Sequence, residues 1–257
     1  MPSETLDADR IKAIFVPVAT LGTLFFNWVA ATGLINGVTP EMVSDKYPTL
    51  VTPAGYAFTI WIMIYIGLAA FSIYQLLPQN AGRFSKVRSL FIVSCVLNCA
   101  WLYFWAFEMI GACVAVILAL LAVIFVINTK LWKPETTAEY WMTKAPFGLY
   151  FGWVASAAAV NIAVFLVYQQ VNISEPAMKI LGIVLMFLTA VVAIAVRSKF
   201  KNYLAPLAVA WALTAIAVKQ SGDTMIVVAA VIGVIACLIA STSVIMDLKT
   251  NNYNARI

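Results

Sequence analysis

The sequence of 257 residues contains no histidine. This absence excludes a haem held by an axial imidazole, a zinc site with histidine ligands, a Ser-His-Asp catalytic triad and a histidine proton relay. The four cysteines, Cys95, Cys99, Cys113 and Cys237, lie in apolar runs without the CxxC spacing that is typical of metal sites. We therefore expect buried, structural cysteines, no metal ligands and no catalytic residue among these types.

Charge is also scarce, because only 11% of the residues are charged whereas 63% are hydrophobic, with a mean hydropathy of +0.95. Soluble domains have about 25% charged and about 45–50% apolar residues. A single water-soluble core could not bury this much apolar surface, so the composition predicts an integral membrane protein. The net charge of +5 lies in short loops, which indicates contact with membrane lipids and no nucleic-acid partner.

The long apolar runs predict an all-α fold with eight transmembrane helices, since each crossing requires about 20 apolar residues. These crossings leave residues 1–12 and 247–257 as terminal tails, with no room for a domain outside the membrane. The predicted crossings are Ala13–Ile35, Pro53–Leu77, Leu90–Ile110, Gly111–Leu131, Ala145–Tyr168, Pro176–Val196, Tyr203–Val218 and Thr224–Met246.

Cap residues followed by prolines mark three of the expected helix starts. Thr52 precedes Pro53, Thr143 lies ahead of Pro146, and Ser174 lies ahead of Pro176. The third and fourth crossings are separated only near Glu108 and Gly111, which predicts a very tight turn. Lys219 and Asp223 are four residues apart, so they could pair if the seventh helix continued past Lys219.

Basic residues indicate the orientation of the chain. Eight crossings place both termini on one side, and this side holds thirteen of the sixteen Lys and Arg residues. Cytoplasmic loops carry an excess of Lys and Arg, so we expect both termini in the cytoplasm, in a bacterial cytoplasmic membrane. The opposite side holds only Lys46, Lys179 and Lys219.

Polar and aromatic residues recur at helical spacing inside three crossings. In the third crossing Ser94, Asn98, Trp101, Trp105 and Glu108 follow one another at steps of 4, 3, 4 and 3 residues, so they share one face. The second and fifth crossings carry similar faces, formed by Phe58, Trp61 and Tyr65, and by Tyr150, Trp153, Ala157 and Asn161.

These faces are consistent with two structures. Interfacial belts of Trp and Tyr and helix–helix hydrogen bonds of Asn are common in membrane proteins. A cavity that binds a flat, apolar ligand with a few polar edges also requires such side chains. On the second interpretation the candidate ligand-binding residues are Phe58, Trp61, Tyr65, Asn98, Trp101, Trp105, Glu108, Tyr150, Trp153 and Asn161.

Three separated motifs resemble the TspO/MBR family, the tryptophan-rich sensory or translocator proteins. They are Pro53-Ala54-Gly55-Tyr56-Ala57-Phe58 followed by Trp61 and Tyr65, Leu97-Asn98 followed by Trp101, and Pro146-Phe147 followed by Trp153 and Asn161. The resemblance covers residues 13–168 and implies a five-helix bundle. Residues 169–246 would then be three additional helices, as in the longer members of that family.

The resemblance implies a multi-pass protein that binds a porphyrin or another tetrapyrrole-like ligand in an aromatic cavity of its first five helices. Such a protein would act as a sensor or carrier. The residues leave other functions open: a secondary transporter of a small solute, a membrane enzyme acting on a lipid or a pigment, or a structural subunit. In the last case helices six to eight would contact a second copy or a partner in a membrane complex.

Overall fold

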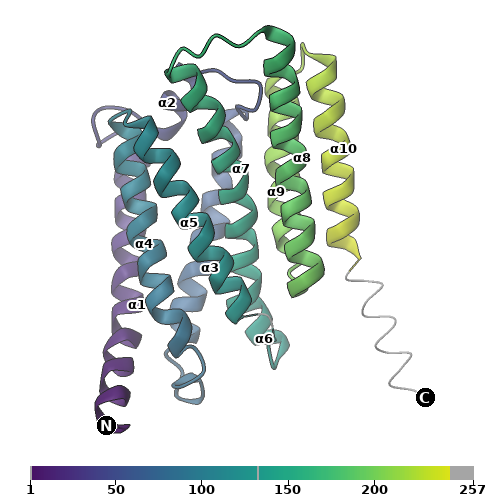
Figure 1. Ribbon diagram of the computed structural model, residues 1–257. Coiled ribbons are helices and arrows are strands. Elements are labelled where there is room, and N and C mark those ends of the chain that lie inside the picture. Colours follow the sequence, from purple (N-terminus) through teal and green to yellow (C-terminus); the bar gives the residue numbers. More distant parts are fainter. Residues whose placement is uncertain (1, 132, 244–257) are drawn as a thin grey trace, which may run out of the picture.

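The computed structural model describes residues 2–131 and 133–243, and these ranges form helices without any strand. Within them, seven helical segments are long and apolar enough to cross a membrane, and a shorter apolar helix, α9 (Leu204–Lys219), lies in the same bundle (Figure 1). The chain is therefore an all-α membrane protein. The seven are α1 (Pro2–Ala31), η1 with α3 (Gly55–Thr59, Ile60–Tyr74), α4 (Ser85–Ala106), α5 (Ile110–Lys130), α6 and η3 with α7 (Thr137–Glu139, Tyr140–Lys144, Ala145–Tyr168), α8 (Glu175–Phe200) and α10 (Thr224–Thr242).

Two short elements lie in the connections. The loop after α1 contains α2 (Pro40–Lys46), which begins at the cap residue Thr39. The loop after α3 contains the single turn η2 (Pro78–Asn80). Figure 1 shows α2 at the same end of the bundle as the turn between α4 and α5.

Several predicted boundaries are confirmed. Helix α7 covers Ala145–Tyr168, as predicted, and α4 and α5 are joined by only three residues. In this turn Glu108 has a left-handed backbone with φ of 56°, which lets the chain reverse its direction within three residues. Ser174 occupies the N-cap position of α8, although its side chain makes no capping hydrogen bond.

Other boundaries were wrong. Thr143 does not start a helix, because its hydroxyl donates to the Glu139 carbonyl at 2.6 Å within the π-helical turn η3, which runs directly into α7. Thr52 accepts a hydrogen bond from the Thr49 amide at 2.9 Å and stays in the loop ahead of η1. Residues 2–12 of the predicted N-terminal tail are helical and extend α1, and their position outside the membrane stays a prediction.

The early part of α1 is tied to the bundle by a charged contact. The buried Arg88 guanidinium of α4 forms an ion pair with Asp9 of α1, and its Nε donates to Gln75 Oε1 at 2.8 Å. This pairing compensates a buried charge, which otherwise would be costly. The predicted end of the last helix, 244–246, and the predicted tail, 247–257, lie outside the described residues.

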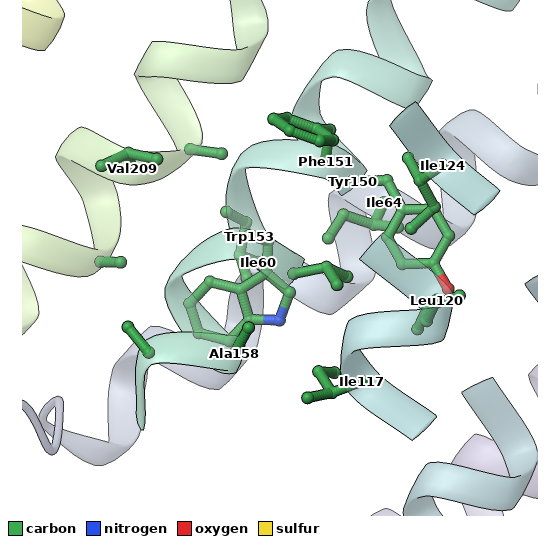
Figure 2. Close-up of a cluster of buried hydrophobic side chains, with 14 of the residues drawn as sticks. Ile60, Ile64, Ile117, Leu120, Ile124, Tyr150, Phe151, Trp153, Ala158 and Val209 are labelled. Carbon is green, nitrogen blue, oxygen red and sulfur yellow. The ribbon is translucent and has the colours of Figure 1, made fainter. Parts of the chain in front are cut away.

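Helix α7 is the centre of the bundle and packs against α3, α5, α8 and α9. Figure 2 shows Tyr150, Phe151 and Trp153 of α7 among apolar side chains of α3, α5 and α9. Glycine permits the closest of these approaches: a Cβ atom at Gly152 would lie 2.1 Å from the Ala205 carbonyl oxygen at the start of α9. Small residues at such contacts let membrane helices approach closely.

The last three helices do not form a separate layer. Helix α9 is rich in alanine and largely buried, and it packs against α7, α8 and α10. Exposed apolar side chains lie instead on α8 and α10, where lipid or another protein could cover them. Examples are Ile180, Val184, Leu188 and Val191 on α8, and Val228, Ile232, Ile235 and Ile239 on α10.

Gly152→Ala is expected to lower the stability of the bundle, because the added methyl group must push α7 away from the backbone of α9. Overpacking of this kind costs about 1–3 kcal/mol. Thermal unfolding in detergent would measure the change. Gly22→Ala in α1 is the matched control, since a Cβ atom there would meet nothing within 4 Å. Equal melting temperatures for Gly152→Ala and the wild type would contradict the close contact.

Candidate ligand-binding site

A small cavity of about 40 Å³ lies between α3, α4, α5, α7 and α9. We call it the inner cavity. Its walls are mainly aromatic and apolar, and the short helix α2 contributes one serine to them. The lining includes Ser44, Phe58, Trp61, Trp101, Trp105, Ile117, Trp153, Asn161, Ala212 and Ile216.

A second cavity of about 480 Å³ lies between α1, α3, α4 and the loop that carries α2. We call it the outer cavity. Phe58 and Trp61 line both cavities, so these two rings separate them. Trp28 and Ile62, which are 57% and 62% exposed, lie at the outer cavity on the exposed side of α1 and α3. The remaining lining residues include Leu24, Asn27, Ala31, Thr39, Pro40, Glu41, Gly55, Thr59, Tyr65 and Leu102.

The aromatic faces predicted on separate helices meet at Trp61. Its ring stacks on Tyr65 with centroids 5.3 Å apart and an interplanar angle of 15°. It also makes edge contacts with Tyr150 and Trp153 of α7, at 5.9 Å and 6.1 Å. Offset stacked and edge-to-face pairs are the favourable arrangements of aromatic rings, so this cluster fixes the orientation of Trp61.

Intramembrane amides link the helices around the cluster. Asn27 of α1 donates from Nδ2 to Asn98 Oδ1 of α4 at 2.7 Å, and the Tyr65 hydroxyl donates to Asn27 Oδ1. Trp101 of α4 donates from Nε1 to Asn161 Oδ1 of α7 at 3.1 Å. Each bond supplies a polar group with a partner where water is absent.

Two buried polar groups at the inner cavity lack such a partner. Among the described residues, neither the Ser44 hydroxyl nor the Trp153 N–H makes a hydrogen bond, although the residues are only 2% and 4% exposed. A buried donor without an acceptor costs about 1–3 kcal/mol. Both donors are buried among the side chains around the inner cavity, and both stay unpaired within the described residues.

Glu108 lines neither cavity. Its carboxylate forms an ion pair with Lys46 at 2.6 Å and accepts a hydrogen bond from the Tyr47 hydroxyl. The Lys46 ammonium, followed by the Tyr47 hydroxyl, lowers the pKa of Glu108 below its ordinary value. Glu108 therefore attaches α2 to the turn between α4 and α5.

Helix α9 holds the same loop from the other side. Lys219 forms an ion pair with Asp45 of α2 at 2.9 Å, and Gln220 Nε2 donates to the Thr49 carbonyl at 2.9 Å. The alternative pairing of Lys219 with Asp223 does not occur, because α9 ends at Lys219. Asp223 instead caps α10 and forms an ion pair with Lys179 at 3.1 Å.

The structure brings most of the predicted site residues together. Six of them, Phe58, Trp61, Trp101, Trp105, Trp153 and Asn161, line the inner cavity, and Tyr65 lines the outer one. Asn98 and Tyr150 lie behind the rings, in contact with Asn27 and Trp61 respectively.

The sequence did not identify Ser44, Glu41, Ala212 or Ile216 as lining residues. The intramembrane position of Asn27 was a usable signal for α1. Alanine and isoleucine on α9 carry no such signal, so the sequence did not predict that α9 also lines the inner cavity, whereas the outer cavity lies within the first five predicted crossings.

The fold defines a multi-pass helical membrane protein, and its two cavities are lined largely by aromatic side chains. A family model described as TSPO-like protein matches residues 13–243, and the chain belongs to this family. The match runs from α1 to the end of α10, so it includes α8, α9 and α10. No curated protein and no solved structure matches the chain.

Acidification is expected to release α2, since protonation of Glu108 removes its ion pair with Lys46. The folded-state pKa of Glu108 is lowered, so its contribution is present above the ordinary value of 4.5 and is lost as the pH falls through the lower folded value. A nitroxide attached through Met42→Cys, an exposed position of α2, would report this as mobility that increases as the pH falls below 4.5 and through the lowered pKa of Glu108.

Glu108→Gln should give the mobile spectrum already at pH 7. Glu175→Gln, which removes an exposed carboxylate from α8, is the control and should leave the spectrum unchanged. An immobile nitroxide in Glu108→Gln at pH 7 would refute the role of this ion pair in holding α2.

Proposed function

We propose that this TSPO-like membrane protein binds a flat hydrophobic molecule of the tetrapyrrole type and acts as its sensor or carrier. The observation that carries the proposal is the outer cavity, whose volume of about 480 Å³ falls within the range of about 300–1,000 Å³ typical of small-molecule sites. The rings of Phe58, Trp61 and Tyr65 supply one aromatic wall. The inner cavity, at about 40 Å³, has room for a water-sized group only.

The chemistry of the lining supports stacking as the main interaction. A flat conjugated ligand covers a Trp or Tyr ring with little loss of conformational freedom. Because the chain has no histidine, a metal-bearing tetrapyrrole would be held without an imidazole ligand. The exposed Trp28 and Ile62 beside the cavity support access from the lipid phase, which suits a ligand that partitions into membranes.

Trp61→Leu is expected to weaken the binding of protoporphyrin by about tenfold or more, because the ring forms the partition and one stacking face of the cavity. Quenching of intrinsic tryptophan fluorescence during titration of the purified protein would measure the dissociation constant. Trp141→Leu is the matched control, because Trp141 is 55% exposed and lines neither cavity. Unchanged affinity in Trp61→Leu, or the absence of saturable binding in the wild type, would overturn the proposal.

The proposed setting is a bacterial cytoplasmic membrane crossed eight times, with both termini in the cytoplasm. Figure 1 places the start of α1 and the end of α10 at the same end of the bundle. The described part of the chain carries eleven basic residues at this end and three at the other, which follows the positive-inside rule. The eleven are Arg10, Lys12, Arg83, Lys86, Arg88, Lys130, Lys133, Lys144, Arg197, Lys199 and Lys201.

The number of crossings is seven or eight, depending on whether α9 spans the membrane. The 16 residues of α9 span about 24 Å at 1.5 Å per residue, somewhat less than the bilayer core of about 30 Å. Its packing between α7, α8 and α10 supports a crossing, since a helix surrounded by crossing helices lies at their depth. Local thinning of the bilayer and the flanking Lys219 can compensate the short length.

Thiol labelling tests the orientation and the eighth crossing together. In spheroplasts, an impermeant maleimide should modify Gly222→Cys, in the loop between α9 and α10, and should modify Gly82→Cys only after lysis. Both positions are exposed and open, and three of the native cysteines are buried. Protection of Gly222→Cys before lysis would contradict the eight-crossing arrangement.

A further inference from the structure

An acidic side chain lies at the α2 end of the outer cavity. Glu41, in the first turn of α2, lines this cavity together with Thr39 and Thr59. Within the described part of the chain, the side chain of Glu41, which is exposed, takes part in no ion pair and no hydrogen bond. This unpaired carboxylate faces a cavity that is otherwise mainly apolar and aromatic.

Gly55 leaves room for the Glu41 carboxylate. A Cβ atom at Gly55 would lie 1.7 Å from Glu41 Oε1, so the carboxylate occupies the space that any larger residue would fill. Gly55 begins η1, the turn that also carries Phe58. The acid therefore lies next to the segment that separates the two cavities.

The neighbouring charges at this end cancel in pairs. Lys46 is neutralised by Glu108, and Asp45 is neutralised by Lys219, in ion pairs of 2.6 Å and 2.9 Å. These pairs leave Glu41 as the net charge that α2 contributes to the outer cavity. A ligand with a positive group at this end gains attraction, whereas a ligand carboxylate there meets repulsion.

The aromatic lining favours the same sign of charge. Trp28, Phe58, Trp61 and Tyr65 all line the outer cavity, and the faces of such rings attract cations. A carboxylate combined with several aromatic faces is a chemistry suited to an organic cation with a flat apolar body. Neither feature recognises an anionic group.

We propose that the outer cavity selects its flat ligand by charge, and that the preferred class is a flat aromatic cation whose positive group lies against Glu41. The inference rests on the proposed function, because it narrows the class of flat ligand that this cavity binds. It also means that the carboxylates of a free-acid porphyrin reduce its affinity when they lie at the α2 end.

Three fluorescent tricyclic probes of nearly equal size test the charge dependence at pH 7.5 in detergent solution. They are 9-aminoacridine, which is a cation, acridine, which is neutral, and anthracene-9-carboxylate, which is an anion. Wild-type protein should bind the cation most tightly. Glu41→Gln should weaken the cation by about fivefold, the size of effect expected for one partly exposed charge, leave acridine unchanged and strengthen the anion.

Opposite changes for the cation and the anion cannot arise from partial misfolding, which would weaken all three probes. Glu175→Gln is the matched control, because it removes an exposed carboxylate at the same end of the bundle but outside both cavities. Its affinities should equal those of the wild type.

Two results overturn the inference, and they can be told apart. If the probes bind and Trp61→Leu weakens them, but Glu41→Gln changes cation and anion alike or not at all, charge selection fails and the proposed function stands. If no probe binds saturably, or if Trp61→Leu has no effect on any of them, the ligand site itself fails and the inference fails with it.

Discussion

The approach of α7 to α9 at Gly152 is the contact on which the arrangement of the inner cavity depends. Without a side chain at Gly152, the Ala205 carbonyl lies against the α7 backbone, and α9 fits closely beside α7. This position allows Ala212 to line the inner cavity and lets Trp211 Nε1 donate to the Ala57 carbonyl of η1 at 3.0 Å. The aromatic cluster thus has a wall supplied from the last third of the chain.

Much of the fold could be predicted from the sequence, because long apolar runs and charged turns are local properties. Helix α7 and the turn at Glu108 follow from such runs and breaks. The start of α1 could not be predicted in this way, since Asp9 is paired with Arg88 across 79 positions in the chain. Threonine is a common N-cap residue, but Thr143 lies inside a π-helical turn. The local sequence does not predict this turn.

The candidate site was predictable where a residue differs in kind from its surroundings. Tryptophan and asparagine inside an apolar run stand out, and Trp61, Trp101 and Asn161 do line a cavity. Position alone determines the role of Ile216 on α9, which resembles any other apolar residue of a membrane helix. Glu108 stands out as an acid, yet its partner Lys46 lies 62 positions away in a loop, so its task of holding α2 depends on the tertiary fold.

The two ion pairs that hold α2 make the cover of the cavities responsive to ionic strength. Lys46 and Lys219 are partly exposed, so mobile ions reach both pairs. Exposed charges are screened over about 10 Å at 0.1 M salt and over about 3 Å at 1 M. The hold on α2 therefore weakens as the salt concentration of the adjoining aqueous phase rises, whereas the amide and indole contacts deeper in the bundle are insulated from it by the membrane.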